Sequence, residues 1–413
     1  MKKYLLMAAC ILAGALTFTS CSKDDDDKNE KTASAEVKAI EELSKQYAEA
    51  VVFPTYTNLA NATETLYEQL EDAKQAFRKG SLTQGDIDKI CATFLNARSF
   101  WEQSEAFLYG PATTFGIDPH IDTWPLDLDA LALALKNSDQ VAMLDNGDDG
   151  IAYAGAKLGQ ELLGFHGIEF IILRDGNNRT LSSLQSNESD KAFTAISANV
   201  TGEQELIYAT AVAGDLRDKC FQLEVAWRGE SASQSHRDRL EECEYETQIG
   251  SNYYGDHISK ATMAGSIYQT WQEVLTTIFD SGCSNICNEV ANTKMGLAYT
   301  GEDPNYIESP YSKKSFQDFY DNIQSIKSSL YGGVGLSSPA SRSIMALTAT
   351  YNPSLATALE SKLAAALQAL QACQQGTAFV DDPKAAKVKA AMDAINALDE
   401  ELATGARWAA TIK

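Results

Sequence analysis

Apolar residues recur at the three- and four-residue spacing of amphipathic helices along nearly the whole chain. This periodicity restricts the fold more than any other feature, because a segment with a helical apolar stripe cannot bury it as a strand. Alternating runs bounded by hairpin turns are few. The sequence therefore predicts an all-α protein. The expected helices cover residues 37–53, 57–77, 86–108, 127–136, 155–173, 189–227, 257–295, 315–330, 354–374 and 383–402.

Three features interrupt this pattern. Pro54 is expected to kink or break the first helix, since proline lacks an amide hydrogen. Gly202 and Gly214 are expected as weak points of the helix over 189–227. The polar stretch 228–256 is expected to leave the bundle as an excursion.

A short internal echo indicates two related halves. Residues 100–103 (Phe-Trp-Glu-Gln) resemble residues 270–273 (Thr-Trp-Gln-Glu), each within an expected helix. Chance explains so short an echo about as well as duplication does. The prediction is two helical bundles, an N-terminal one over 36–190 and a C-terminal one over 191–413.

The N-terminal residues have the sequence features of an exported protein. Lys2 and Lys3 precede an apolar run of signal-peptide length, so residues 1–20 are predicted to be a signal peptide. The small residues before Cys21 resemble the lipobox of a bacterial lipoprotein, which predicts lipidation of Cys21; the alternative is an ordinary signal peptide. Residues 21–35 are predicted to be an acidic tether, and they resemble the export signal of surface-exposed Bacteroidetes lipoproteins. The expected location is the outer membrane facing the cell surface, with a periplasm-facing lipoprotein as the alternative.

The charge of the chain limits its partners. It has 57 acidic against 34 basic residues and a formal net charge of −23. Nucleic-acid binding requires a basic surface, so this class is excluded. Attachment to anionic lipid by charge is excluded for the same reason, which leaves the lipid anchor as the only expected membrane contact. A cationic ligand is compatible with this charge.

Six cysteines lie beyond the predicted signal and lipidation site, and export permits disulfides between them. Their spacing lacks the Cys-x-x-Cys of zinc sites. We therefore expect buried thiols or one or two disulfides rather than a metal cluster. The six are Cys91, Cys220, Cys243, Cys283, Cys287 and Cys373.

The segment 164–169, Gly-Phe-His-Gly-Ile-Glu, carries the clearest chemical signal. In a helix, His166 and Glu169 lie one turn apart on one face. Such a pair makes half of a metal site or an acid–base pair. The alternative is a purely structural pair, with Glu169 bound to an arginine such as Arg98. Gly164 and Gly167 indicate either a pocket or the close approach of another helix.

Together with three other segments, this motif resembles the imelysin-like family. The other segments are 101–111, with Trp101, Glu102, Ser104 and Glu105; 121–127, with Asp122 and Trp124; and 307–322, with Glu308, Ser309, Asp318 and Asn322. The resemblance implies two similar helical bundles with the motif near their interface. It also implies export and a link to iron acquisition, with iron-transport components as expected partners. Some members carry metallopeptidase names, and iron-uptake relatives bind metal through a similar His-x-x-Glu.

These observations lead to a hypothesis of metal binding. The expected ligands are His166 and Glu169, completed by Glu102, Glu105, Asp122 or Glu308, around a divalent metal such as iron or zinc. A site of carboxylates and one imidazole suits iron, whereas a thiol-rich site is typical of zinc. The expected pocket residues are Gly164, Gly167, Trp101, Ser104, Trp124 and Ser309.

Two other functions remain open at this stage. A metallopeptidase would use Glu169 with His166, although the zincin motif His-Glu-x-x-His is absent. The other is a non-catalytic surface lipoprotein that binds a small ligand or is structural. The remaining histidines, His120, His236 and His257, stand in polar sequence and are expected at the surface.

Overall fold

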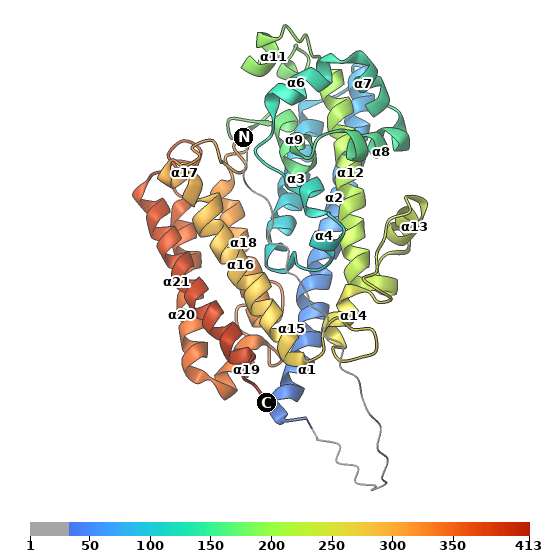
Figure 1. Cartoon of the computed structure of the whole chain (residues 1–413). Helices are drawn as coiled ribbons and strands as arrows, with labels where there is room; N and C mark the ends of the chain where they lie inside the picture. Colours follow the sequence, from blue (N-terminus) through green and yellow to red (C-terminus); the bar gives the residue numbers. More distant parts are fainter. Residues whose placement is uncertain (1–32) are drawn as a thin grey trace, which may run out of the picture. The chain divides into compact units, whose positions relative to one another are not determined.

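The computed structural model describes residues 33–413, which are almost entirely helical (Figure 1). The first part of the chain forms α1 (Ala35–Tyr47), η1 (Ala48–Val52), α2 (Phe53–Arg78), α3 (Gln84–Glu102), η2 (Glu105–Phe107), α4 (Pro111–Thr114), α5 (Asp118–Ile121), α6 (Leu128–Lys136), α7 (Ser138–Leu144), α8 (Gly147–Lys157), η3 (Gln160–Leu162), α9 (Gly164–Ile172), α10 (Leu181–Leu184), α11 (Lys191–Ala195) and α12 (Gly202–Arg228). The rest forms η4 (Gly229–Ser231), α13 (Gln234–Glu242), α14 (Tyr254–Ser259), α15 (Trp271–Thr277), η5 (Ile278–Ser284), α16 (Asn285–Asn288), η6 (Glu289–Lys294), α17 (Gly296–Thr300), α18 (Ser315–Tyr331), α19 (Ile344–Tyr351), α20 (Pro353–Cys373) and α21 (Ala386–Ala409).

The strands are minimal. β1 (Leu173–Arg174) and β2 (Asn177–Asn178) pair antiparallel as a short hairpin at the end of α9. The predicted all-α fold is confirmed.

Pro54 does not break the first helix as expected. α1, the π-helical segment η1 and α2 follow one another without a gap, and Pro54 lies in the first turn of α2. Because proline has no amide hydrogen, the preceding turn lacks one backbone hydrogen bond at this position. The wider π-helical turn accommodates this change in the hydrogen-bond ladder.

Helix α12 forms the centre of one bundle, and nearly every residue along it is buried. It packs lengthwise against α2 and also contacts α8 and α9 (Figure 1). The expected helix over 189–227 is in fact two, since Thr201 and Gln204 form a capping box that starts α12 at Gly202. Gly214 is no weak point: a Cβ there would lie 2.5 Å from Ile151 of α8. The glycine therefore permits close packing of the two helices.

The expected helix over 155–173 is also divided. α8 ends at Lys157, and α9 begins only at Gly164, whose φ is +67°. A Cβ on Gly164 would lie 2.0 Å from the Ile121 carbonyl oxygen. A side chain at this position is excluded both by the backbone conformation and by the contact.

The second group of long helices comprises α18, α20 and α21, with the segment from α15 to η6 against α21. The expected helix over 257–295 begins later, at Trp271, and contains the π-helical segments η5 and η6. α12 follows residue 190 in sequence yet packs with α2, α8 and α9. The division at residue 190 and the duplication of the bundles stay predictions.

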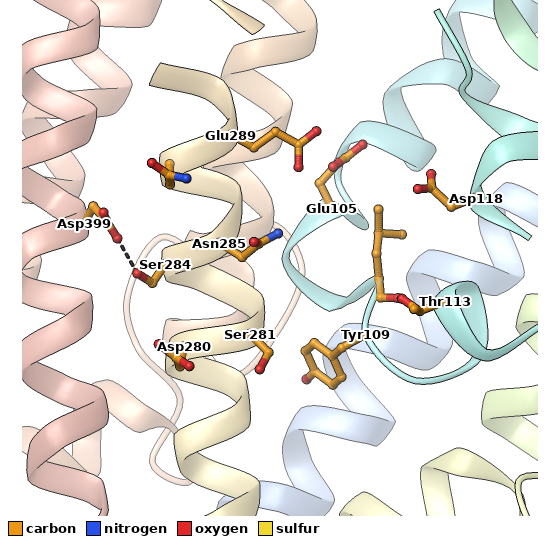
Figure 2. A pocket seen from close by; sticks show the side chains of 12 residues that line it. Glu105, Tyr109, Thr113, Asp118, Asp280, Ser281, Ser284, Asn285, Glu289 and Asp399 are labelled. Carbon is orange, nitrogen blue, oxygen red and sulfur yellow. Dashed lines mark hydrogen bonds between the residues drawn. The ribbon is translucent and has the colours of Figure 1, made fainter. Parts of the chain in front are cut away.

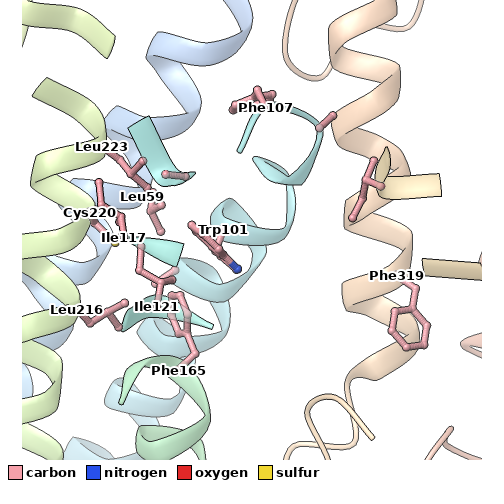
Figure 3. Close-up of a cluster of buried hydrophobic side chains, with 14 of the residues drawn as sticks. Leu59, Trp101, Phe107, Ile117, Ile121, Phe165, Leu216, Cys220, Leu223 and Phe319 are labelled. Carbon is pink, nitrogen blue, oxygen red and sulfur yellow. The ribbon is translucent and has the colours of Figure 1, made fainter. Parts of the chain in front are cut away.

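An apolar cluster lies between α12, α2 and the segments that carry the candidate site (Figure 3). Trp101, Ile121 and Phe165 are fully buried there, together with Leu59 and Leu216. Each such side chain contributes about 1.5–3 kcal/mol to stability relative to an exposed one. The cluster fixes the ends of α3, α5 and α9 relative to one another.

Two further findings bear on the predictions. All six cysteines within residues 33–413 are free thiols. None of the helices in this range is both long and apolar enough to cross a membrane. The predicted signal peptide and Cys21 lie outside the described residues, as does most of the predicted tether.

Candidate metal centre

Six carboxyl groups from distant parts of the chain meet in the interior, each with a side chain no more than about a twentieth exposed. They are Glu102 at the end of α3, Glu105 in η2, Asp122 after α5, Glu169 in α9, Glu308 in the loop before α18, and Asp318 in α18. Burying one carboxylate is costly unless it is paired. We call this set the acidic cluster.

Within the acidic cluster, the carboxylate of Asp122 contacts three side chains. The His166 Nε2 and Asp122 Oδ1 atoms are 2.9 Å apart, and the Trp101 indole donates to Asp122 Oδ2 at 2.8 Å. Arg98 also contacts Asp122 Oδ1. Burial opposes ionisation, but Arg98 and His166 outweigh it and hold the pKa of Asp122 well below its ordinary value.

His166 and Glu169 lie on one face of α9, as the spacing predicts. His166 Nδ1 is 3.5 Å from Glu169 Oε2, and Glu169 Oε1 accepts a hydrogen bond of 2.7 Å from the Ser312 amide. Burial disfavours the imidazolium, yet the bonds to Asp122 and Glu169 raise the pKa of His166 to about 9. In the metal-free protein this histidine is therefore protonated at neutral pH.

Gly167 serves close packing. A Cβ there would lie 2.3 Å from the Tyr208 hydroxyl, which donates to the Leu162 carbonyl at 2.6 Å. The motif glycines were expected to indicate a pocket or the close approach of another segment. Close approach explains Gly164 as well as Gly167. Neither lines a described cavity that reaches His166.

Two permanent cations are buried among the carboxylates. Arg98 Nη2 is 2.5 Å from Glu102 Oε1 and 2.6 Å from Glu308 Oε1. Lys294 Nζ donates to Glu308 Oε1 at 3.1 Å and lies 3.6 Å from Glu105 Oε1. Among the described residues, the Arg98–Glu169 ion pair of the structural alternative is not formed.

The acidic cluster contains more carboxyl groups than cations. Six carboxyls face Arg98, Lys294 and the titratable His166. Burial raises the pKa of Glu102 and Glu105 well above the ordinary value, and that of Asp318 to about 7. Glu308 Oε2 and Asp318 Oδ2 are among the buried oxygens that accept no hydrogen bond from the described residues. The cluster therefore keeps buried acceptor oxygens for which the described residues provide no donor.

Three overlapping sets of these groups have ligand atoms within 4.8 Å of one another. One set is Asp122, His166 and Glu308, and it combines an imidazole with two carboxylates. The others are all-carboxylate: Glu102, Glu308 and Asp318, and Glu102, Glu105 and Asp122. Such distances allow one cation to contact three ligands at once.

A cavity of about 450 Å³ reaches the site at His166. Its walls are largely apolar and include Trp124, Ile307, Pro310 and Tyr311. Trp124 lies against Tyr306, with ring centroids 3.9 Å apart. The expected pocket residue Trp124 thus lines a cavity.

The other expected pocket residues have different positions. Trp101 is fully buried and donates to Asp122, and the Ser104 hydroxyl donates to the Trp101 carbonyl at 2.7 Å. Ser309 is buried in a turn with a φ of +50°. These residues shape the site without lining the cavity.

Sequence reasoning missed Lys294, and it assigned Arg98 a different partner. The only signal for Lys294 is a lysine among Val290, Ala291 and Met295, on what becomes a buried helix face. Arg98 is similarly a charged residue within the apolar stripe of α3. Charged residues on an apolar stripe are rarely buried unpaired, so such positions point to internal ion pairs.

The prediction of three surface histidines was wrong. His236 is 1% exposed, stacks on Phe221 with centroids 3.8 Å apart, and contacts Glu224 at 2.5 Å. His257 is fully buried and hydrogen-bonded to backbone atoms, and His120 is half-buried, 2.9 Å from Asp215. Polar neighbours in sequence misled the interpretation because they lie on the outer faces of the same short helices.

The sequence profile of the Imelysin family, peptidase family M75, matches residues 52–404. The chain belongs to the imelysin family. The predicted family is thereby confirmed, and the acidic cluster lies within the matched range.

Relatives with known names agree with this assignment. Iron-regulated protein A of Synechococcus elongatus is 24% identical over 326 residues, which cover 79% of this chain and 74% of that protein. A crystal structure from Parabacteroides distasonis, described as an iron-regulated protein A precursor, has a TM-score of 0.71 at 22% identity and covers 90% of this chain and 95% of its own. An imelysin-like protein from Psychrobacter arcticum has a TM-score of 0.55 at 13% identity, covering 88% and 93%. At these identities the two structures show a shared fold.

Proposed function

We propose that this member of the imelysin family binds a metal ion in the acidic cluster, with Asp122, His166 and Glu308 as ligands. One observation carries the proposal: six buried carboxyls surround only two permanent cations, and Glu308 keeps an oxygen without a hydrogen bond. A divalent cation would balance this charge in a place that water hardly reaches.

The donor atoms favour a hard or borderline cation. Oxygen ligands with one imidazole suit iron or manganese, and no cysteine belongs to the cluster. The names of the relatives, iron-regulated protein A, support iron among these metals. We therefore propose iron as the ligand and iron acquisition as the process.

The residues of this chain would each have a separate role. Asp122, His166 and Glu308 would hold the metal, and Trp101 would orient Asp122 through its indole hydrogen bond. Glu169 would orient His166 from the other ring nitrogen, as outer carboxylates do at histidine ligands. Arg98 and Lys294 would balance the remaining carboxylates and compete with the metal for them.

Calorimetric titration with Mn²⁺, and with Fe²⁺ under anaerobic conditions, tests the proposal. We expect His166→Ala and Glu308→Gln each to weaken binding about tenfold or more, as losses of single ligand contacts do. His120→Gln is the matched control, because it disrupts another histidine–aspartate pair outside the cluster. Equal affinities in the wild type, the two ligand variants and the control would reject this site.

A metallopeptidase is the second candidate, and the peptidase name of the matched family supports it. Its chemistry requires a metal-held water beside a peptide bond. The side chains of Asp122, His166 and Glu308 are at most 4% exposed, so a peptide would have to reach them through the cavity at Trp124. Binding of an ion needs no such space and is therefore favoured. Casein cleavage that is lost on chelation and in His166→Ala would instead establish the peptidase.

We also propose that Cys21 anchors the protein to the outer membrane, facing the cell surface, where iron-transport components would be its partners. The support is the sequence of residues 1–28, with its apolar run, its cysteine and its acidic tether. Incorporation of a labelled fatty acid into the wild type but not into Cys21→Ala tests the anchor. Protease digestion of intact cells tests the surface location, since a periplasm-facing protein would be protected.

A further inference from the structure

Two cavities reach the acidic cluster, and their walls differ in chemistry. The larger, of about 650 Å³, has five acids among its lining residues; Figure 2 shows Glu105 and Asp118 on one side of it and Glu289 on the other. The smaller is the cavity of about 450 Å³ at His166, which we call the apolar cavity. An ion loses its hydration in an apolar cavity and keeps it in a polar one. Metal binding in the acidic cluster therefore leaves the apolar cavity without a role.

The walls of the apolar cavity carry no strong charge. Among residues 33–413, those that line it include no aspartate, glutamate, lysine or arginine, although charged residues make up 22% of the chain. The lining residues are Trp124, Pro125, Leu126, Leu128, His166, Pro304, Asn305, Ile307, Pro310, Tyr311 and Val380. Such walls offer an ion of either sign no partner, so binding of a charged molecule would be costly. The walls suit an uncharged ligand.

His166 contributes ring carbons to these walls. Its Nε2 is 2.9 Å from Asp122 Oδ1, and its Nδ1 is 3.5 Å from Glu169 Oε2. Both nitrogens are therefore engaged within the acidic cluster, and the carbon atoms of the ring remain for the cavity. The same holds when one of the nitrogens binds a metal.

Two half-buried aromatic rings, those of Trp124 and Tyr311, line the apolar cavity. The Trp124 ring packs against Tyr306, with centroids 3.9 Å apart, and its centroid is 6.3 Å from that of His166. The Tyr311 ring meets Phe170 edge-on, with centroids 5.1 Å apart. Neighbouring rings thus hold both side chains in place, while part of each remains accessible. Accessible aromatic surface of this kind favours contact with another aromatic ring.

The Tyr311 hydroxyl adds a polar group to this apolar surface. It forms no hydrogen bond with the other described residues, although burial raises the pKa of the phenol above its ordinary value. The hydroxyl of a largely buried tyrosine usually has a partner. A ligand with a hydroxyl or carbonyl group would provide one.

The walls are fixed before a ligand binds. Three of the lining residues are prolines, whose φ angle is restricted. The Tyr311 carbonyl accepts a hydrogen bond of 2.8 Å from the Gly176 amide, and the Ser312 amide donates to Glu169 at 2.7 Å. Binding to a preformed cavity costs little ordering of the protein. The volume of about 450 Å³ is also within the range of small-molecule sites.

We propose that the apolar cavity binds a small uncharged molecule with an aromatic ring, which lies against Trp124 and Tyr311. The uncharged walls exclude an ion, the two rings favour an aromatic ligand, and the volume limits its size. This site goes beyond the metal binding proposed above and does not depend on it. His166 takes part in both, through its ring carbons here and through a nitrogen in the metal site.

Three probes of similar shape and different charge test the ligand class. They are cinnamyl alcohol, which is uncharged, cinnamate, which is negative, and cinnamylammonium, which is positive. Equilibrium dialysis against the purified protein in the presence of EDTA measures their affinities without metal. We expect cinnamyl alcohol to bind at least about tenfold more tightly than either charged probe, because an unpaired charge is costly in an apolar site.

Two pairs of variants locate the binding site. Leu128→Glu places a carboxylate at the apolar cavity, and Leu133→Glu makes the same change on the same helix, at a leucine that is 60% exposed and does not line the cavity. Trp124→Ala removes an aromatic wall, and Trp271→Ala removes a half-buried ring of α15 as its control. We expect cinnamyl alcohol to bind about tenfold more weakly to the two cavity variants and equally well to the wild type and both controls.

The proposal is overturned if cinnamyl alcohol shows no saturable binding, or if either charged probe binds more tightly. It is equally overturned if the controls lose as much affinity as the cavity variants, because the molecule would then bind elsewhere. The dialysis contains no free metal, so a failure of the proposed metal site leaves its result unchanged. A failure of the cavity proposal likewise leaves the Mn²⁺ titration unchanged.

Discussion

Two of the buried clusters of charged groups within residues 33–413 differ in their ratio of carboxyl groups to cations. In the first, six carboxyls face Arg98 and Lys294. In the second, two carboxyls face two guanidiniums: Arg179 contacts Glu205 at 2.7 Å and Glu188 at 3.1 Å, and Arg174 contacts Glu188 at 2.6 Å. A matched set of groups can close a structure without a ligand, whereas an excess of one sign needs a counter-ion.

Unpaired atoms alone do not separate the two clusters. Within residues 33–413, Glu205 Oε2 in the matched cluster accepts no hydrogen bond, and neither does Glu308 Oε2 in the acidic cluster. The ratio of carboxyl groups to cations separates them. The matched cluster ties the hairpin after α9 to α12. The acidic cluster joins α3, α9 and α18 with the loops after α5 and before α18. We therefore interpret the matched cluster as structural and keep the acidic cluster as the proposed binding site.

The largest expected effect is the removal of one guanidinium from each cluster. Arg98→Gln and Arg179→Gln should each lower the free energy of unfolding by about 3–5 kcal/mol, because each leaves buried carboxylates unpaired. Saturating Mn²⁺ should restore stability to Arg98→Gln only, by about 2.7 kcal/mol at a concentration one hundred times the dissociation constant. Urea unfolding with and without Mn²⁺ measures both effects. Rescue of Arg179→Gln to the same extent would remove the distinction between the clusters.

The sequence predicted the acidic cluster in part. The motif residues His166 and Glu169 lie in one cluster with side chains from three other segments, namely Glu102, Glu105, Asp122 and Glu308. This could be predicted because the segments resemble those of a known family. The helical class followed from the apolar periodicity alone.

The countercharges could not be predicted in the same way. Lys294 lies at the end of the π-helical segment η6, whose wider turns differ from the α-helical period that the sequence pattern assumes. The division at Gly164 was also missed, because the periodicity continues across it. Contacts between distant segments decide both features, and the periodicity of one segment contains no information about them.

The pH dependence of stability should differ between the clusters. The pKa of His166 is raised to about 9, so its contribution in the metal-free protein is complete below its ordinary pKa of 6.5 and is lost as the pH rises through 9. The groups that face it are Asp122, Glu169 and Arg98. A shift of this size corresponds to on the order of 3 kcal/mol.

The contribution of the matched cluster to stability should instead be lost at low pH. The pKa of Glu188 is lowered to about 2, although burial opposes this, by Glu205 and the two arginines. Its contribution is present above pH 4.5 and is lost as the pH falls through 2. Chemical denaturation from pH 2 to 10 should show the alkaline loss reduced in His166→Gln and the acid loss reduced in Glu188→Gln. An unchanged alkaline limb in His166→Gln would contradict the assignment.

A smaller effect is expected for Lys294→Met. This substitution removes a cation that shares Glu308 with the proposed metal, so Mn²⁺ affinity should rise about tenfold, or about 1.4 kcal/mol. Arg174→Met is the control in the matched cluster and should leave Mn²⁺ affinity unchanged. Calorimetry measures both. Weaker Mn²⁺ binding in Lys294→Met would mean that the lysine supports the site rather than competes with the ion.

The smallest effect is expected for Glu205→Gln at pH 6. Arg179 lowers the pKa of Glu205, but burial outweighs this effect and raises the pKa to about 8. At pH 6 the carboxyl is therefore already neutral. Glutamine keeps the shape and the acceptor for Arg179, and the variant should therefore lie within about 1 kcal/mol of the wild type. At pH 9 the difference should grow, because the wild-type carboxyl is then charged. If urea unfolding shows a loss of several kcal/mol at pH 6, Glu205 is ionised there and the matched cluster is balanced in charge as well as in groups. A small loss means that Glu205 is neutral at pH 6 and that Glu188 alone carries the negative charge that faces Arg174 and Arg179.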